Sequence, residues 1–107
     1  MDEYISISLQ SIVKLSVEYW RNKSRQDKNS RFNREVKKFL ENNEIEIVDL
    51  KNKEYDPGMA LKVLHYDNSS NTEKKIIKKT ISPIIIYNGK VVKEGEVLLS
   101  EKKEEEN

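Results

Sequence analysis

The side chains best suited to chemistry are few and widely spaced. His65 is the only histidine in the chain. A histidine that acts as a general base needs a nucleophile or a carboxylate in reach, and a histidine in a metal site needs several further ligands. No spacing around His65 supplies either set, so we interpret it as a structural or surface residue. We predict no catalytic residue and no enzymatic activity.

A group of acidic residues offers a second kind of chemistry, the binding of a cation. Glu44 and Glu46 alternate along one segment, and Asp49, Glu54 and Asp56 follow. The segment lacks the glycine-punctuated Asp/Asn loop of a calcium site. The chain also has no cysteine, which excludes a zinc–thiolate site, a disulfide and a thiol nucleophile. We therefore predict a solvated strand face, with no metal and no cofactor.

Lys90 and Lys93 are candidates for modification or contact, because they lie in a glycine- and valine-rich segment. This segment, residues 86–98, resembles the hairpin with which biotinyl and lipoyl carrier domains present a lysine. No methionine flanks either lysine here. We therefore favour a hairpin whose lysines are not modified.

A basic stretch between residues 21 and 40 is the strongest compositional signal for a binding surface. Basic side chains along helices can neutralise phosphates. These residues surround a helix end without forming one stripe, and Phe32 and Phe39 occupy apolar helical positions. We favour a solvated or partner-facing surface and keep nucleic-acid binding as an alternative. The eight basic residues are Arg21, Lys23, Arg25, Lys28, Arg31, Arg34, Lys37 and Lys38.

Composition limits the size of the core that positions these residues. The 107 residues are enough for one domain, and 36% of them are charged while 36% are apolar. The usual charged fraction is about 25%, so the excess needs a large surface. We expect either an elongated molecule or a thin layer that a second copy covers. The longest apolar run, residues 84–87, is too short to span a bilayer, and the acidic start is unlike a signal peptide. We expect a cytoplasmic protein without membrane association.

The N-terminal third of the chain has a helical apolar pattern. Its apolar residues fall on one helical stripe from Ile5 to Trp20, although Ile5, Ile7 and Leu9 also alternate with serines as in a strand. We favour a helix because the pattern continues for about 16 residues, which is too long for an ordinary strand. A second helix is predicted from an N-cap at Ser30 to the Asn42-Asn43 pair.

Two such helices form a helical hairpin whose apolar faces need further cover. Two hairpins packed together form a four-helix bundle, so we predict a homodimer. The residues predicted to lie in the dimer interface are Ile5, Leu9, Ile12, Trp20, Phe32, Val36 and Phe39.

From Glu44 onward the apolar period changes to two, which is typical of strands. Asp56-Pro57-Gly58 predicts a turn, Asn88-Gly89 predicts a hairpin, and Gly95 indicates a second turn or a bulge. We expect four to six short strands. The predicted fold is α+β, with a dimerising helical hairpin over residues 1–43, a small all-β domain over 44–100 and a polar tail over 101–107.

The order of elements over residues 31–100 resembles GrpE, the nucleotide exchange factor of the DnaK chaperone. Glu54-Tyr55-Asp56-Pro57 is similar to the Phe-Asp-Pro turn of that family. The segment 87–93 is similar to its Leu-Asn-Gly-Arg hairpin, and Val97-Leu98-Leu99 is similar to its closing strand. The chain departs from the family in lacking the His-Glu-Ala after the turn and in its shortened N-terminal helix.

This resemblance implies a cochaperone that acts without a catalytic group. Its β domain would bind the open nucleotide-binding domain of a DnaK-type chaperone and promote ADP release. By position, Lys90 and Leu99 match family contacts, and Met59 beside the turn is a further contact candidate. Two alternatives stay open, namely an interaction module of the same fold without exchange activity and a basic nucleic-acid-binding protein.

Overall fold

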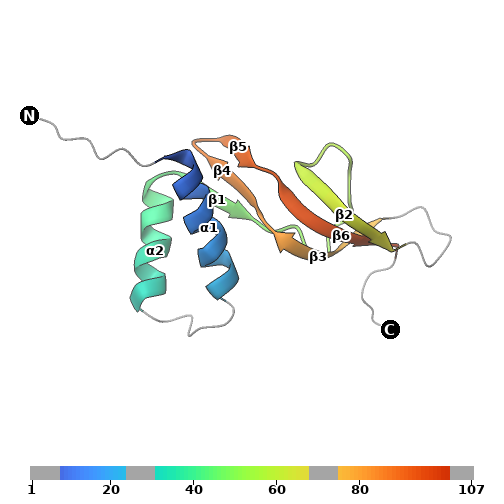
Figure 1. Ribbon diagram of the computed structural model, residues 1–107, viewed down its shortest axis with the longest axis horizontal. Helices are drawn as coiled ribbons and strands as arrows, with labels where there is room; N and C mark the ends of the chain where they lie inside the picture. Colours follow the sequence, from blue (N-terminus) through green and yellow to red (C-terminus); the bar gives the residue numbers. More distant parts are fainter. Residues whose placement is uncertain (1–7, 24–30, 68–74, 102–107) are drawn as a thin grey trace, which may run out of the picture.

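The computed structural model describes residues 8–23, 31–67 and 75–101, which form helices followed by strands (Figure 1). The helices are α1 (Leu9–Lys23) and α2 (Arg31–Asn42). The strands are β1 (Ile45–Val48), β2 (Leu61–Asp67), β3 (Ile76–Ser82), β4 (Ile84–Tyr87), β5 (Lys90–Lys93) and β6 (Gly95–Ser100). The predicted α+β class and the predicted four to six short strands are confirmed over the described part of the chain.

The strands form two sheets of three strands each. The first sheet has the order β1-β4-β5 and is antiparallel throughout. The second has the order β2-β6-β3, in which β3 is antiparallel and β2 parallel to the central strand β6. Figure 1 shows the first sheet beside the helices and the second sheet beyond it along the long axis.

Two stretches of backbone connect the sheets directly. Pro83 alone separates β3 from β4, and Glu94 alone separates β5 from β6, so each stretch passes from one sheet into the other. The two stretches are joined at Asn88 and Gly89, whose φ angles of 55° and 81° confirm the predicted tight hairpin turn. Residues 76–100 are therefore one long hairpin shared by both sheets.

Gly95 lies where this hairpin changes sheets, so the turn or bulge predicted there is wrong. The residue begins β6 and is buried. A Cβ atom at this position would lie 2.9 Å from Leu61 Cδ2, 3.1 Å from Ile84 Cγ1 and 3.1 Å from the carbonyl oxygen of Ser82. The sequence has glycine here because the neighbouring strands approach too closely for a side chain.

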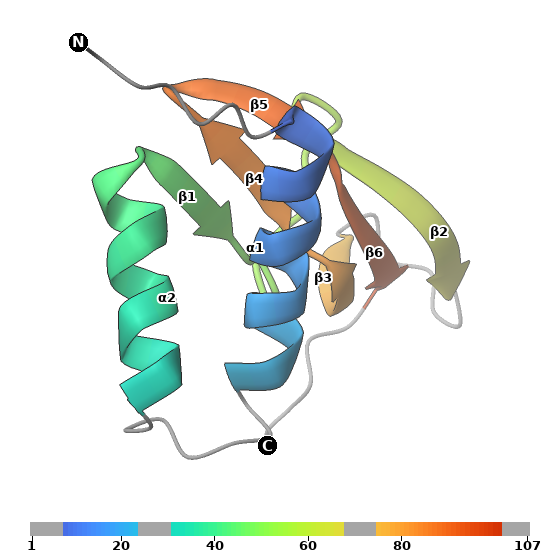
Figure 2. The same ribbon diagram turned by 60° about the vertical axis from the view of Figure 1, so that its left-hand side comes forward.

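Both helices pack on one face of the first sheet (Figure 2). The core between them consists of Ile12, Val17, Leu40, Ile45 and Ile85. Ser16 is fully buried on the same side of α1, and its hydroxyl donates a hydrogen bond to the carbonyl oxygen of Ile12 at 2.8 Å. The sheet therefore provides much of the cover that the apolar helix faces need. The boundary predicted at residues 43–44 marks the change from helix to strand, while this core extends across it.

A second core lies under the second sheet. Ile77, Val97 and Leu99 form its centre, and the connection between β1 and β2 covers them with Leu50, Tyr55 and Met59. The amide of Asn52 donates to the carbonyl of Ile77 at 2.7 Å, which holds this connection against β3. The predicted turn is confirmed there, since the amide of Gly58 donates to Asp56 Oδ1 at 2.9 Å.

The two cores lie one after the other, which makes the molecule long and thin. Its principal extents are 63 × 30 × 17 Å and its radius of gyration is 16.5 Å. A compact domain of this length has a radius of gyration of about 13 Å. Of the two forms expected from the charged composition, an elongated molecule or a thin layer that a second copy covers, these dimensions match the first.

The helix ends match the sequence signals in part. Helix α2 ends at Asn42 as predicted, and the side-chain amide of Asn43 donates to the carbonyl of Phe39 at 2.8 Å. Helix α1 begins at Leu9, after Ser8, whose Oγ accepts a hydrogen bond from the amide of Ser11 at 3.1 Å. The predicted helical residue Ile5 and the predicted cap Ser30 lie outside the described residues.

Candidate interaction surfaces

The hairpin tip presents Lys90 to solvent. Lys90 is the first residue of β5 and pairs with Tyr87 of β4 across the turn. Both side chains are exposed, and so is that of Val91. We call these three residues the hairpin surface. It places a cation beside exposed apolar area, both of which are available for contact with another protein.

Leu99 is not a surface residue, which corrects its assignment as a contact. Its side chain is 3% exposed and packs with Ile77 and Val97 in the second core. The residue beside it, Leu98, is half-buried and pairs with His65 and Lys79 on the opposite face of the second sheet. Because successive residues of a strand face opposite sides of the sheet, Val97 and Leu99 share one face and Leu98 lies on the other. This rule could have indicated that Leu98 and Leu99 differ in burial.

Met59 is half-buried and packs against the second core. Its amide donates to the carbonyl of Asp56 at 2.9 Å, which places it at the end of the turn. Lys90 belongs to the first sheet, whereas Met59 and Leu99 belong to the core of the second. The structure therefore does not gather the three predicted partner-binding residues into one cluster.

The residues predicted for a dimer interface divide into two groups. Ile12 is buried in the first core and Val36 packs against it, so both are used within the chain. Trp20 is half-buried, and its Nε1 donates to Asp49 Oδ2 at 3.2 Å. Leu9, Phe32 and Phe39 remain exposed, at 45%, 70% and 37% respectively. Ile5 lies outside the described residues.

A shallow groove between α1 and α2 lies beside the most exposed of these residues. It has a volume of about 150 Å³ and is lined by Leu15, Tyr19, Phe32 and Val36, with polar neighbours. Leu15 is itself exposed, although it was not among the residues predicted for the dimer interface. We call Leu15, Phe32 and the groove between them the helix-pair surface. It is an apolar face that nothing in the described chain covers.

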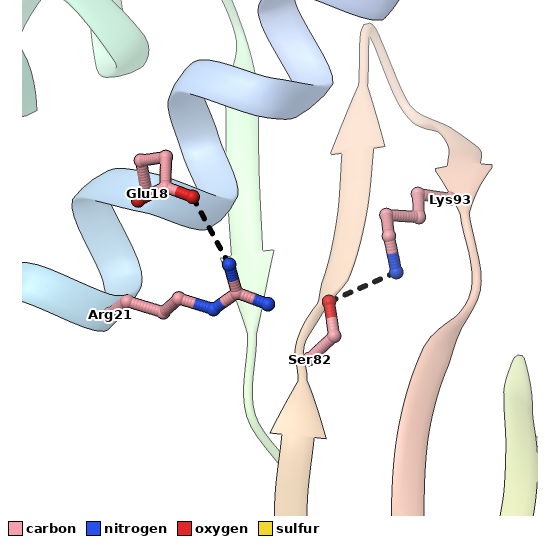
Figure 3. A network of polar contacts seen from close by, with 4 residues as sticks. All are labelled: Glu18, Arg21, Ser82 and Lys93. Atoms are coloured by element: carbon pink, nitrogen blue, oxygen red, sulfur yellow. Dashed lines mark hydrogen bonds and ion pairs between the residues drawn. The ribbon is translucent and has the colours of Figure 1, made fainter.

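A larger groove lies between α1 and the edge strand β5. Its volume is about 540 Å³, and its lining includes Val13 and Val17 of α1 with Val92 and Lys93 of β5. Figure 3 shows the polar contacts on its two sides. Glu18 forms an ion pair with Arg21 at 3.0 Å, and Lys93 Nζ donates to Ser82 Oγ at 2.9 Å. We call it the α1–β5 groove.

Two neighbouring titratable residues of β2, His65 and Tyr66, have structural surroundings. His65 is exposed on β2, and no group of three or more His, Asp or Glu residues able to hold a metal occurs among the described residues. Tyr66 donates a hydrogen bond to Glu101 Oε2 at 2.7 Å. This bond, together with desolvation and the charge of Glu101, raises the pKa of Tyr66 above its ordinary value.

The basic segment gives no single stripe over its described part. Arg31, Lys37 and Lys38 are exposed on α2, while residues 24–30 lie outside the described chain. Lys38 approaches Glu35 at 4.0 Å, which is a weak surface pair.

None of the described helices has the length and apolar character required to cross a membrane. No protein-family model, curated protein or solved structure matches the chain.

Proposed function

We propose that this chain is a dimeric nucleotide exchange factor of the GrpE type, which binds the nucleotide-binding domain of a DnaK-type chaperone in the cytoplasm. The observation that carries the proposal is the order of the β elements. A strand, an aromatic-Asp-Pro turn, a second strand and a valine-rich hairpin follow one another at residues 45–48, 54–57, 61–67 and 84–100. This is the order in which the resembling family has them.

The position of Lys90 supports a contact at the hairpin. Lys90 corresponds to the arginine that follows the hairpin glycine in that family, and its side chain is exposed beside Tyr87 and Val91. A cation surrounded by apolar area can form a charge-assisted hydrogen bond that is partly shielded from water. On the second sheet, the half-buried Leu98 replaces Leu99 as the residue of the last strand able to meet a partner.

The proposed mechanism is a shift in the population of chaperone conformations. The β domain binds the open nucleotide cleft more tightly than the closed one, and this difference in affinity moves the equilibrium toward the open form. To move it from 1:99 to 99:1 the difference must be about 10⁴-fold. ADP then leaves without any chemical step, so the protein needs no catalytic side chain.

The proposed dimer uses the helix-pair surface. Phe32 and Leu15 are exposed there beside an apolar groove, and a second copy of the same two helices completes a four-helix bundle. A two-fold interface brings the same patch together from both copies, so the large aromatic side chain of Phe32 is buried in the contact twice, once from each copy.

The test measures release of fluorescent ADP from the cognate DnaK-type chaperone in the presence of the full chain. We expect the wild type to accelerate release and Lys90→Glu to reduce the acceleration by at least about tenfold. A tenfold loss of affinity corresponds to about 1.4 kcal/mol of binding free energy. Lys38→Glu, which reverses an exposed charge on α2, serves as the matched control and keeps full activity. Absence of acceleration by the wild-type chain contradicts the proposal.

An interaction module that binds the chaperone without releasing nucleotide is the second candidate. The departures from the family after the Asp-Pro turn favour it. Binding of the chain to the chaperone with an unchanged ADP release rate selects this candidate.

A further inference from the structure

We propose that the α1–β5 groove is a docking site for an extended, acidic and apolar peptide segment of a partner protein, which adds to the free edge of β5. This inference concerns the groove that α1 lines together with Val92 and Lys93, the two residues that follow Lys90 and Val91 of the hairpin surface along β5. It does not depend on exchange activity.

The floor of the groove is apolar and has room for side chains. Leu9, Val13 and Val17 line it from α1, and Val92 lines it from β5. Its volume of about 540 Å³ lies within the usual range of ligand pockets, roughly 300–1,000 Å³. Leu9 remains 45% exposed at one end of the groove. The groove therefore has apolar area that the chain's own described residues leave in contact with water.

The rim of the groove is predominantly positive. Lys14, Arg21 and Lys93 line it together with one carboxylate, that of Glu18. Glu18 is already paired with Arg21 at 3.0 Å. Lys93 Nζ donates to two neutral oxygens, Ser82 Oγ at 2.9 Å and the carbonyl of Glu94 at 3.0 Å, so these bonds leave its charge uncompensated. An occupant with carboxylates is complementary to this rim.

The edge strand determines the form of the occupant. The first sheet has the order β1-β4-β5, so among the described residues β5 pairs with β4 alone, and Val92 and Lys93 of this edge strand line the groove. An exposed edge has backbone donors and acceptors ready for one more strand, and peptides commonly bind in this way. The register with β4 is irregular next to Ile85, and Val92 and Lys93 both line the groove at this point. An added strand therefore meets an apolar and a cationic side chain from consecutive residues.

The test uses a fluorescent eight-residue peptide of alternating isoleucine and glutamate as the probe and the full chain as the receptor. We expect saturable binding that weakens as salt is raised, because the rim charges are partly exposed. The same peptide with lysine in place of glutamate should not bind. Lys14→Glu should weaken binding of the acidic probe by about fivefold or more, while the control Lys38→Glu leaves it unchanged.

A second variant keeps the proposal falsifiable. Leu9→Asp places a carboxylate at the first residue of α1, where it is compatible with the helix, and should abolish probe binding. Equal binding of the acidic and basic probes, or binding that both Lys14→Glu and Leu9→Asp leave unchanged, overturns the proposal. Residues 1–7 also contain acidic and apolar side chains. If the double variant Ile5→Asp/Ile7→Asp binds the probe tenfold more tightly than the wild type, residues 1–7 of the same chain compete for the groove. That result contradicts the proposal that the groove is a docking site for a partner protein.

Discussion

The hydroxyl of Thr80 donates a hydrogen bond of 2.6 Å to Oδ1 of Asp49. The other oxygen of the same carboxylate accepts from Trp20 Nε1 at 3.2 Å. One side chain in the connection after β1 thus links α1, which covers the first sheet, to β3, which belongs to the second. Asp49 was considered as part of a cation site, and the structure instead gives it this role in joining the two halves of the molecule.

Removal of this carboxylate should destabilise the fold. Thr80 is buried, so Asp49→Ala leaves its hydroxyl without this acceptor, and we expect the free energy of unfolding to fall by about 2 kcal/mol. Thr80→Val removes the donor and should cost about 1 kcal/mol, because Asp49 can be hydrated. Urea denaturation of the single and double variants gives the coupling energy. Glu46→Ala, at an exposed position of β1, is the control, and purely additive effects would contradict the link.

Gly95→Ala should destabilise the protein although alanine is a small residue. The added methyl group would meet the Leu61 side chain at 2.9 Å and the backbone oxygen of Ser82 at 3.1 Å, and the backbone atom cannot move without disturbing β3. We expect a loss of about 1–3 kcal/mol. Gly58→Ala is the matched control, because its nearest neighbour would be Asp56 Oδ1 at 3.5 Å. Equal melting temperatures for the two variants would show that the strands do not approach as closely as described.

The contact between Tyr66 and Glu101 should make stability depend on alkaline pH. The hydrogen bond to Glu101 raises the pKa of Tyr66, so the protonated phenol is favoured in the folded protein. This contribution is fully present below the ordinary tyrosine pKa of about 10 and is lost as the pH rises through the higher folded value. Thermal melts between pH 9 and pH 12 should show a steeper decline for the wild type than for Tyr66→Phe. Equal declines for the wild type and Tyr66→Phe would contradict the contribution of this hydrogen bond.

Phe32→Glu should separate the proposed dimer into monomers. The side chain is 70% exposed in one chain, so its replacement leaves the fold of the monomer intact. A buried aromatic at the centre of an interface commonly contributes 2 kcal/mol or more, and here it enters twice. Light scattering after gel filtration should change from twice the chain mass of 12.6 kDa to that mass itself. A wild-type chain that is monomeric at all concentrations contradicts the dimer.

The local signals in the sequence predicted the local structure well. The Asn88-Gly89 turn, the Asp56-Pro57-Gly58 turn and the end of α2 follow from the backbone preferences of single residues, which do not depend on the rest of the fold. The split into two sheets was not predicted. The split depends on the packing, around Gly95, of strands that are distant in the sequence. The sequence alone does not show whether a glycine allows a turn or a close approach between strands.

The exposure of individual side chains was harder to predict than the helices and strands. An apolar helix face indicates contact but not its partner, so Ile12 and Phe32 were grouped together although one packs on the first sheet and the other is exposed. Likewise, a position in the last strand placed Leu99 at a contact, whereas the pleat of β6 turns that residue inward. Burial depends on which elements cover a face, and this information is not local.

The long hairpin of residues 76–100 restricts how the length of this region can change. Each of its two stretches belongs to both sheets, and side chains alternate between faces along them. Insertion or deletion of one residue between Ile84 and Tyr87 must be absorbed by a new bulge, or it shifts the pairing register and exchanges buried for exposed side chains. Homologous chains should therefore differ in sequence along this hairpin much more readily than in length.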